Sequence, residues 1–256
     1  DAYNAYVTDI FRNRYESPRP PFTTLQMPLQ GIGEWCHPKQ TADIDDSGLR
    51  KCANPLLGND SLGIYDTGKG LHFLISRKGR NIAFSSLWDN YPDEVRIPIT
   101  PKAKSYNAAY LMLAGTTNNM QSRIDNALVI AEYEEGCADT LHLENPINWP
   151  TINEEYVFDD YAFWSAPVMP LRFRLDNGAV GRHINSTELL TTVPSKKENK
   201  EKKIGEDNRY AIEKGAGVIL NMPLNPARRI RAIRIKTLSN DIVVGIMAIT
   251  LQKTSD

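Results

Sequence analysis

The apolar and polar side chains of this chain alternate over many short runs, and turn-forming residues separate the runs. In one such run Val129, Ala131 and Tyr133 fall on one face, and Glu132 and Glu134 fall on the other. A period of two is typical of a strand with one buried face and one solvated face. The pattern therefore predicts an antiparallel β-sheet protein.

The expected strands occur along the whole chain, and turn residues or polar loops separate them. They cover residues 22–29, 62–66, 71–76, 81–87, 94–99, 107–114, 124–134, 138–143, 161–164, 170–175, 217–223, 229–238 and 242–251. Such a series predicts an all-β fold, an antiparallel β-sandwich. With 256 residues the chain is long enough for one large β domain or two small ones, and we expect one domain over 22–256.

Several turns and one irregularity are visible in the sequence. Glu135-Gly136 and Asp176-Asn177-Gly178 predict tight turns between strands, and Ser239-Asn240-Asp241 predicts the turn between the last two strands. In 229–238 the apolar positions change parity halfway along the run. An extra residue restores such a pattern to one face, so we expect a β-bulge near Ala232.

Three segments are not expected to be strands. Residues 1–21 predict a short helix over 1–16 and a proline-rich strut, which either leaves a preceding domain or packs on the sandwich itself. Residues 31–60 are polar and irregular, and a loop of this length is often functional. Residues 194–209 are almost entirely charged or polar and predict a solvated, mobile loop.

The overall charge limits the classes of partner. Thirty basic and thirty-one acidic residues give a formal net charge of −1, so charge gives no reason to expect nucleic acid. No apolar run approaches the roughly 18 residues that span a bilayer, so no membrane span is expected. The first residues are polar and aromatic and do not resemble a signal peptide. This is expected of a mature form and equally of an excised piece.

The three cysteines are Cys36, Cys52 and Cys137. An odd number leaves at least one thiol unpaired within the chain. Cys36 and Cys52 flank a polar loop and are a candidate disulfide in an oxidising compartment, and three free thiols are the alternative.

One acidic segment is similar to the start of a calcium-binding loop. Asp43, Asp45 and Ser47 occupy alternate positions and Gly48 follows, which is the spacing of the first oxygen ligands and the sharp turn. The twelfth position holds Asn54 where the full motif has a glutamate. A structural calcium ion is therefore one interpretation. The other is an Asp-rich turn whose carboxylates accept backbone N–H bonds, and no further cofactor is expected.

The aromatic residues are the main candidates for ligand binding. A sugar presents an apolar C–H face that stacks on an aromatic ring, and its hydroxyls bond to neighbouring polar side chains. The candidates for such a glycan site are Trp88, Asp89, Asn90 and Tyr91, then Trp35 with Asp45 and Asp46 from the long loop, and Trp149 beside Asn148. The alternative for each tryptophan is packing in the core.

No catalytic motif of nucleophile, metal or phosphate chemistry occurs, so we do not expect an enzyme. A glycoside hydrolase that acts through two carboxylates remains the alternative, because such pairs meet only in the folded chain.

Whole phrases of the sequence resemble a known group of proteins. Residues 31–50, 82–99, 109–136, 143–163 and 217–251 look like the β-sandwich module of large secreted, glycoside hydrolase-like proteins from polysaccharide-degrading Gram-negative bacteria. The resemblance covers about residues 22–251 and includes no catalytic signature. It implies a jelly-roll, galactose-binding-like sandwich in the periplasm or at the cell surface, with a polysaccharide and a neighbouring catalytic domain as partners.

Three functions follow from these observations. The first is a carbohydrate-binding or accessory module, which predicts an exposed aromatic ring beside polar groups. The second is a purely structural module that packs on a catalytic domain, which predicts an apolar patch and buried tryptophans. The third is a hydrolase, which predicts two carboxylates in one cleft, about 5 to 10 Å apart.

Overall fold

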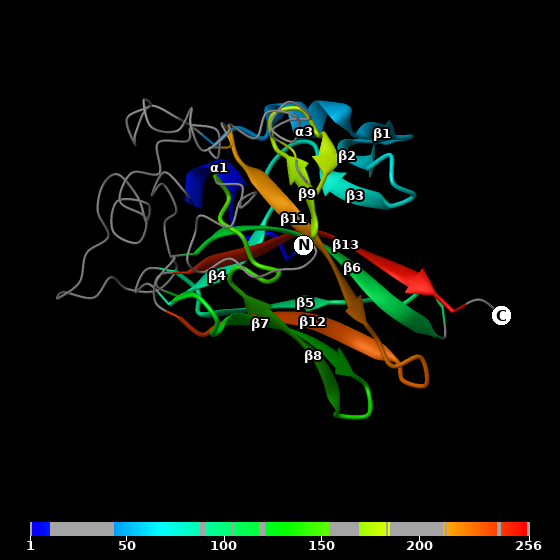
Figure 1. Cartoon of the computed structure of the whole chain (residues 1–256). Coiled ribbons are helices and arrows are strands. Elements are labelled where there is room, and N and C mark those ends of the chain that lie inside the picture. Colours follow the sequence, from blue (N-terminus) through cyan, green and yellow to red (C-terminus); the bar gives the residue numbers. More distant parts are fainter. Residues whose placement is uncertain are drawn as a thin grey trace.

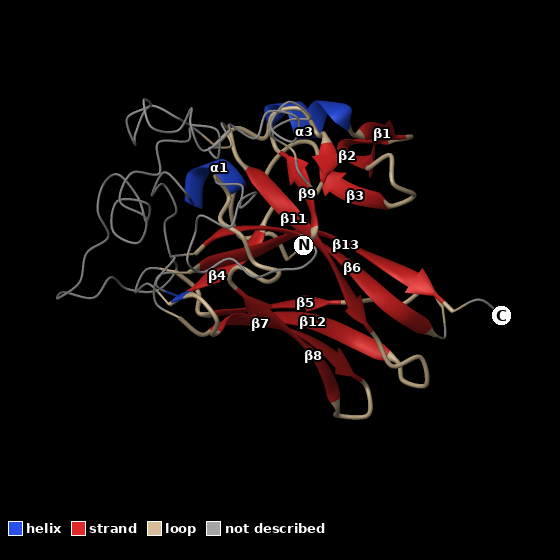
Figure 2. Ribbon diagram, viewed as in Figure 1, coloured by secondary structure: helices blue, strands red, loops and turns tan. Residues whose placement is uncertain are grey.

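Most of the chain that the structure describes is antiparallel β-sheet, as Figure 2 shows for this computed structural model. The prediction of an all-β antiparallel sandwich is therefore confirmed. The described residues are 2–10, 44–87, 91–103, 105–117, 121–153, 169–182, 184, 212, 214–239 and 242–254.

A six-stranded sheet occupies the centre of the molecule (Figure 1), and its strand order is β10-β9-β11-β6-β13-β4. The pairings between these strands are antiparallel. The strands are β4 (Ala83–Ser86), β6 (Tyr106–Thr116), β9 (Leu171–Arg174), β10 (Val180–Gly181), β11 (Ala216–Pro223) and β13 (Val243–Lys253).

A four-stranded antiparallel sheet covers one face of the six-stranded sheet. Its strand order is β5-β12-β7-β8, and the strands are β5 (Glu94–Pro98), β7 (Asp125–Tyr133), β8 (Ala138–Glu144) and β12 (Ile230–Thr237). The facing side chains of the two sheets form one apolar core, with Leu113 and Val244 from the larger sheet and Val129 and Ile233 from the smaller one. This is the packing of a β-sandwich.

The opposite face of the six-stranded sheet is covered by short elements. These are the helices α1 (Val7–Ile10) and α3 (Ser47–Cys52) and a three-stranded sheet of β1 (Asn54–Leu56), β2 (Asn59–Asp66) and β3 (His72–Ser76). Leu49 of α3 and Phe73 of β3 pack in a second core with Met112, Phe173 and Ile219 of the large sheet. The six-stranded sheet is therefore buried over much of both faces.

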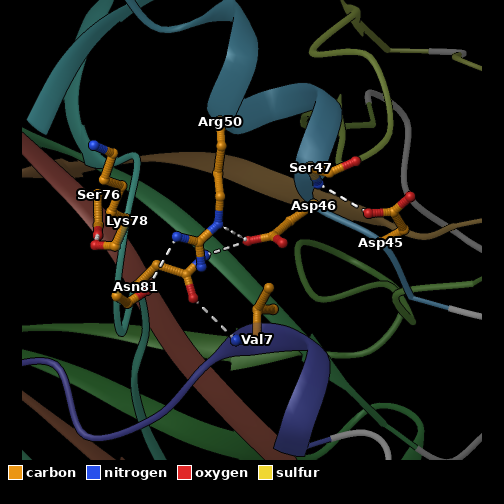
Figure 3. A network of polar contacts seen from close by, with 9 residues as sticks. Val7, Asp45, Asp46, Ser47, Arg50, Ser76, Lys78 and Asn81 are labelled. Atoms are coloured by element: carbon orange, nitrogen blue, oxygen red, sulfur yellow. Dashed lines mark hydrogen bonds and ion pairs between the residues drawn. The ribbon is translucent and has the colours of Figure 1, made fainter. Parts of the chain in front are cut away.

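A buried polar network joins the covering elements to one another (Figure 3). The Asp46 carboxylate accepts hydrogen bonds from Arg50 Nε, at 2.8 Å, and from the Asn81 amide. The Asn81 side-chain oxygen in turn accepts the backbone N–H of Val7 at 3.0 Å, and Arg50 Nη1 donates to the Gly79 carbonyl at 3.0 Å. The network thus ties α1, α3 and the β3–β4 connection together.

The local predictions on the described strands agree with the structure. Val129, Ala131 and Tyr133 are buried in the core between the sheets, while Glu132 and Glu134 face outward. The turn at 134–136 joins β7 to β8, and the turn at 175–177 follows β9.

The predicted bulge is also present. The pairing of β12 with β7 shifts between Ile230 and Ala232. Because one extra residue lies there, Ile230 and Ile233 both reach the core although they differ in parity.

The prediction of an irregular loop over residues 31–60 is wrong for residues 47–60. Residues 47–60 include α3, β1 and the start of β2. The apolar side chains Leu49 and Ala53 pack in the core there, and β1 pairs with β2. The helix expected over 1–16 appears in the described residues as α1 alone, and the first residues pair with Ile82.

Other predictions fall on residues that the structure does not describe. They are the strands at 22–29 and 161–164, the proline-rich strut, the charged loop at 194–209 and Asn240-Asp241 of the last turn. Cys52 and Cys137 are free cysteines, and Cys36 lies outside the described residues. In the described chain, no helix has the length and apolar character needed to cross a membrane.

Candidate ligand-binding site

An open pocket lies where the turn between β2 and β3 meets β6 and β13. Its cavity volume is about 530 Å³, within the range of small-ligand sites. The lining residues are Lys69, Gly70, Leu71, His72, Tyr110, Thr250 and Gln252.

A second β-bulge positions two of these side chains. The pairing of β13 with β6 shifts between Ile246 and Ala248. Before the shift, Val244 and Ile246 face the core between the two large sheets. The extra residue inverts this parity, so Thr250 and Gln252 lie on the pocket face, with Thr250 opposite Tyr110.

Tyr110 combines a packed ring with a polar edge. The side chain is half-buried, and its ring contacts the core beneath the covering elements. Its hydroxyl donates a hydrogen bond to Gln252 Oε1 at 3.2 Å. Gln252 is exposed, and its amide N–H groups have no partner among the described residues. The pair therefore offers an aromatic surface, a hydroxyl oxygen and two amide donors to a ligand.

The turn that carries Lys69 is closed by its own hydrogen bonds. Both the backbone N–H and the hydroxyl of Thr67 donate to the Leu71 carbonyl, at 3.1 and 2.9 Å. The Lys69 N–H donates to Thr67 Oγ1 at 3.2 Å. Gly68 and Gly70 have φ of 65° and 79°, the left-handed region that favours glycine. These bonds and glycines hold the Lys69 backbone at the rim of the pocket.

The two walls of the pocket are linked directly. Thr250 Oγ1 donates to the backbone carbonyl of His72 at 2.6 Å, which fixes the start of β3 against β13. His72 Nε2 lies 3.5 Å from Asp66 Oδ2, and both side chains are more than half exposed. Asp66 also accepts the Gly68 N–H at 2.8 Å. Hydrogen bonds within the chain thus hold the segments that form the pocket.

None of the predicted ligand-binding residues that the structure describes lines this pocket. Tyr91 and Trp149 are fully buried in the structure. Tyr91 stacks edge-on against Phe84, and its hydroxyl donates to the Ile10 carbonyl at 3.3 Å. Burial removes the exposed ring face that sugar stacking needs, and for Trp149 it agrees with the alternative of packing in the core. Trp35, Trp88, Asp89 and Asn90 lie outside the described residues.

The predicted calcium segment forms a turn followed by a helix. Asp45 Oδ1 accepts the Ser47 N–H at 3.0 Å (Figure 3), as in the Asp-rich turn that was the alternative. Within the described part of the chain, no three acidic, histidine or cysteine side chains are grouped as metal ligands would be. Asp43 is outside that part. The calcium ion therefore stays a prediction.

Sequence reasoning missed the pocket residues. Tyr110 was expected only as part of the strand over 107–114, and nothing was predicted for Lys69, which lies between the strands expected over 62–66 and 71–76. One signal was present in the sequence. The apolar residues Val244 and Ile246 are followed by Ile249 and Leu251, a change of parity that indicates a bulge near Met247.

A network of ion pairs covers the outer face of the four-stranded sheet. Glu132 accepts a hydrogen bond from Arg96 Nε at 2.8 Å and lies 3.5 Å from Arg231 Nη2. Arg234 Nε is 3.0 Å from Glu132 Oε1, but the contact is not aligned as a hydrogen bond. The hydrogen bond from Arg96 lowers the pKa of the Glu132 carboxyl below its ordinary value. The charges of Arg234 and Arg231 add to this shift.

This network predicts a pH-dependent contribution to stability. Because folding lowers the pKa of Glu132, its contribution is present above the ordinary pKa of about 4.3 and is lost as the pH falls through the folded value. We expect the Glu132→Gln variant to lose about 1 kcal/mol of the free energy of unfolding at pH 7 and less at low pH. Urea unfolding from pH 7 to pH 3 measures the difference. A constant difference across this range would contradict the prediction.

Comparison with protein-family models, with curated proteins and with solved structures gave no match for this chain.

Proposed function

We propose that this protein is a non-catalytic carbohydrate-binding or accessory module of a glycoside hydrolase-like protein, and that it binds a glycan in the pocket at Tyr110. The observation that carries the proposal is an aromatic ring beside an amide, a hydroxyl and a cation in one open pocket of about 530 Å³. This combination suits a sugar, because the ring can stack on C–H groups and the polar groups can bond to hydroxyls.

The resemblance in sequence supports the same function. It implies a galactose-binding-like jelly-roll, a periplasmic or cell-surface location and a neighbouring catalytic domain, and we include these in the proposal. Trp88, Asp89 and Asn90 remain predicted contributors to binding. A hydrolase would need a pair of carboxylates, and no acidic side chain is among the described residues that line this pocket.

The test is the loss of glycan binding in the Tyr110→Ala variant. A glycan array first identifies a bound oligosaccharide, and calorimetry then gives its Kd. We expect Tyr110→Ala to weaken binding about tenfold or more, because a ring–ligand contact of about 1.4 kcal/mol or more is lost. Tyr110→Phe keeps the ring and is expected to retain most of the affinity.

The control is Tyr6→Ala, which removes an exposed tyrosine that does not line the pocket. Circular dichroism establishes that each variant is folded. Equal affinity of folded Tyr110→Ala and the unchanged protein would reject this pocket as the glycan site.

A structural module that packs on a catalytic domain is the second candidate. Ile64 and Leu74 pair across β2 and β3 and are 41% and 47% exposed on the outer face of the three-stranded sheet. Leu57 at the β1–β2 turn is fully exposed. Exposed apolar groups that cluster on one face are typical of a contact surface. If a folded protein binds no glycan on the array, this second function is favoured over the first.

A further inference from the structure

We propose that the pocket at Tyr110 selects a sugar unit that carries a negative charge, either the carboxylate of a uronic acid or a sulfate ester. The inference rests on the proposed glycan-binding function and adds the class of sugar. The observations behind it are the charged side chains around the pocket and their partners.

Lys69 is the first of these observations. Its side chain is exposed at the pocket rim, and no carboxylate of the described residues lies within 4.0 Å of its ammonium group. Lys78, in the bend after β3, is by contrast paired with Asp60. The closed turn at 67–71 fixes the Lys69 backbone, so only the side chain has to be ordered when a ligand binds. An ammonium group without an internal partner, at the edge of a polar pocket, is suited to an anionic ligand group.

The other polar groups of the pocket favour the same ligand. The amide N–H groups of Gln252 have no partner among the described residues and are donors. The lining set contains Lys69 and His72 but no acidic side chain. Asp66, which is not among the lining residues, lies beside His72 and accepts the Gly68 N–H. A carboxylate or sulfate that enters the pocket therefore meets donors and one unpaired cation.

A neutral sugar uses this arrangement less well. Its hydroxyls bond to Gln252 and Tyr110, but none of them forms an ion pair with Lys69. A hydrogen bond in which donor and acceptor are both charged is stronger than one between neutral groups. We therefore expect the acidic sugar to bind about tenfold more tightly than its neutral counterpart.

The experiment compares three ligands of similar size with the intact chain. They are a galacturonate oligosaccharide, the matched neutral galactose oligosaccharide and a sulfated galactose oligosaccharide, each titrated by calorimetry. The variants are Lys69→Gln, Tyr110→Ala and the control Lys51→Gln, which removes an exposed lysine of α3 that does not line the pocket.

The inference predicts that at least one acidic ligand binds about tenfold more tightly than the neutral one. It also predicts that Lys69→Gln removes this preference while Lys51→Gln keeps it, and that about 0.5 M salt weakens only the acidic ligand. Preference for the uronate or for the sulfate identifies the source of the charge.

Three results would overturn the inference, and they differ in what they say about the proposed function. If acidic and neutral ligands bind equally and Tyr110→Ala weakens both, the charge selection is wrong and the glycan site stands. An acidic preference that Lys69→Gln leaves unchanged overturns the inference for this pocket, because the charge is then recognised elsewhere, and the effect of Tyr110→Ala decides whether the glycan site stands. If neither these ligands nor any glycan of the array binds to the folded chain, both proposals are rejected.

Discussion

The Trp149→Ala variant is expected to lose about 3 to 5 kcal/mol of the free energy of unfolding. Trp149 is fully buried in the core between the two large sheets. Its indole lies directly over Gly115 of β6, where an added Cβ would come within 2.5 Å of the ring atom Cζ2. The side chain therefore fills a space that a glycine leaves open, and its removal creates a cavity that the sheets cannot close.

Trp149→Phe is the matched control for this prediction. The indole N–H is buried and has no hydrogen-bond partner among the described residues. Phenylalanine removes this unpaired donor and keeps most of the aromatic volume, so we expect a loss of less than about 1.5 kcal/mol. Urea unfolding measures both variants. If Trp149→Ala unfolds like the unchanged protein but loses glycan binding, Trp149 is a ligand contact and not a core residue.

The second large effect is expected for Asp46→Ala. Asp46 is 6% exposed and accepts hydrogen bonds from both Arg50 and Asn81. Removal of the carboxylate leaves the Arg50 charge without its partner in a largely buried position. Loss of one partner of a buried ion pair costs about 3 kcal/mol or more. We expect this loss in urea unfolding, together with weaker protection of the α1 and α3 amides in hydrogen exchange.

Asp60→Ala is the control for Asp46→Ala. Asp60 also pairs with a cation, Lys78, but both side chains are more than 60% exposed. Water solvates both charges when the pair is broken, so little change in stability is expected. Equal stability losses in the two variants would contradict the view that burial sets the cost.

The strands and the sandwich class could be predicted from the sequence because their signals are local. The run 124–134 predicted β7, which the structure gives as Asp125–Tyr133. The parity change near Ala232 predicted the bulge in β12 because a strand with one buried face tolerates only one arrangement of its apolar residues. Turn residues such as Gly136 mark strand ends by their backbone preferences alone.

Whether a tryptophan or tyrosine side chain is buried or exposed could not be predicted from such local signals. Tyr91 and Trp149 stand beside Asp, Asn and Pro, as an exposed binding residue does, and yet both are buried. The flanking residues indicate only that the chain turns at this point. Burial depends on which other segments pack against it. The Ile10 carbonyl, which accepts the Tyr91 hydroxyl, and Gly115, which lies against the Trp149 ring, are distant in sequence from these residues.

The sequence by itself determined the periodicity, the turns and one bulge, because these depend on the chemistry of neighbouring residues. Only the tertiary structure decided the pocket. Tyr110 and Gln252 are 142 residues apart, and Thr250 and the His72 carbonyl are 178 residues apart. The pairing of β6 with β13 and the shift near Met247 bring these groups together. Such contacts depend on the register of distant strands, which the whole apolar core fixes during folding.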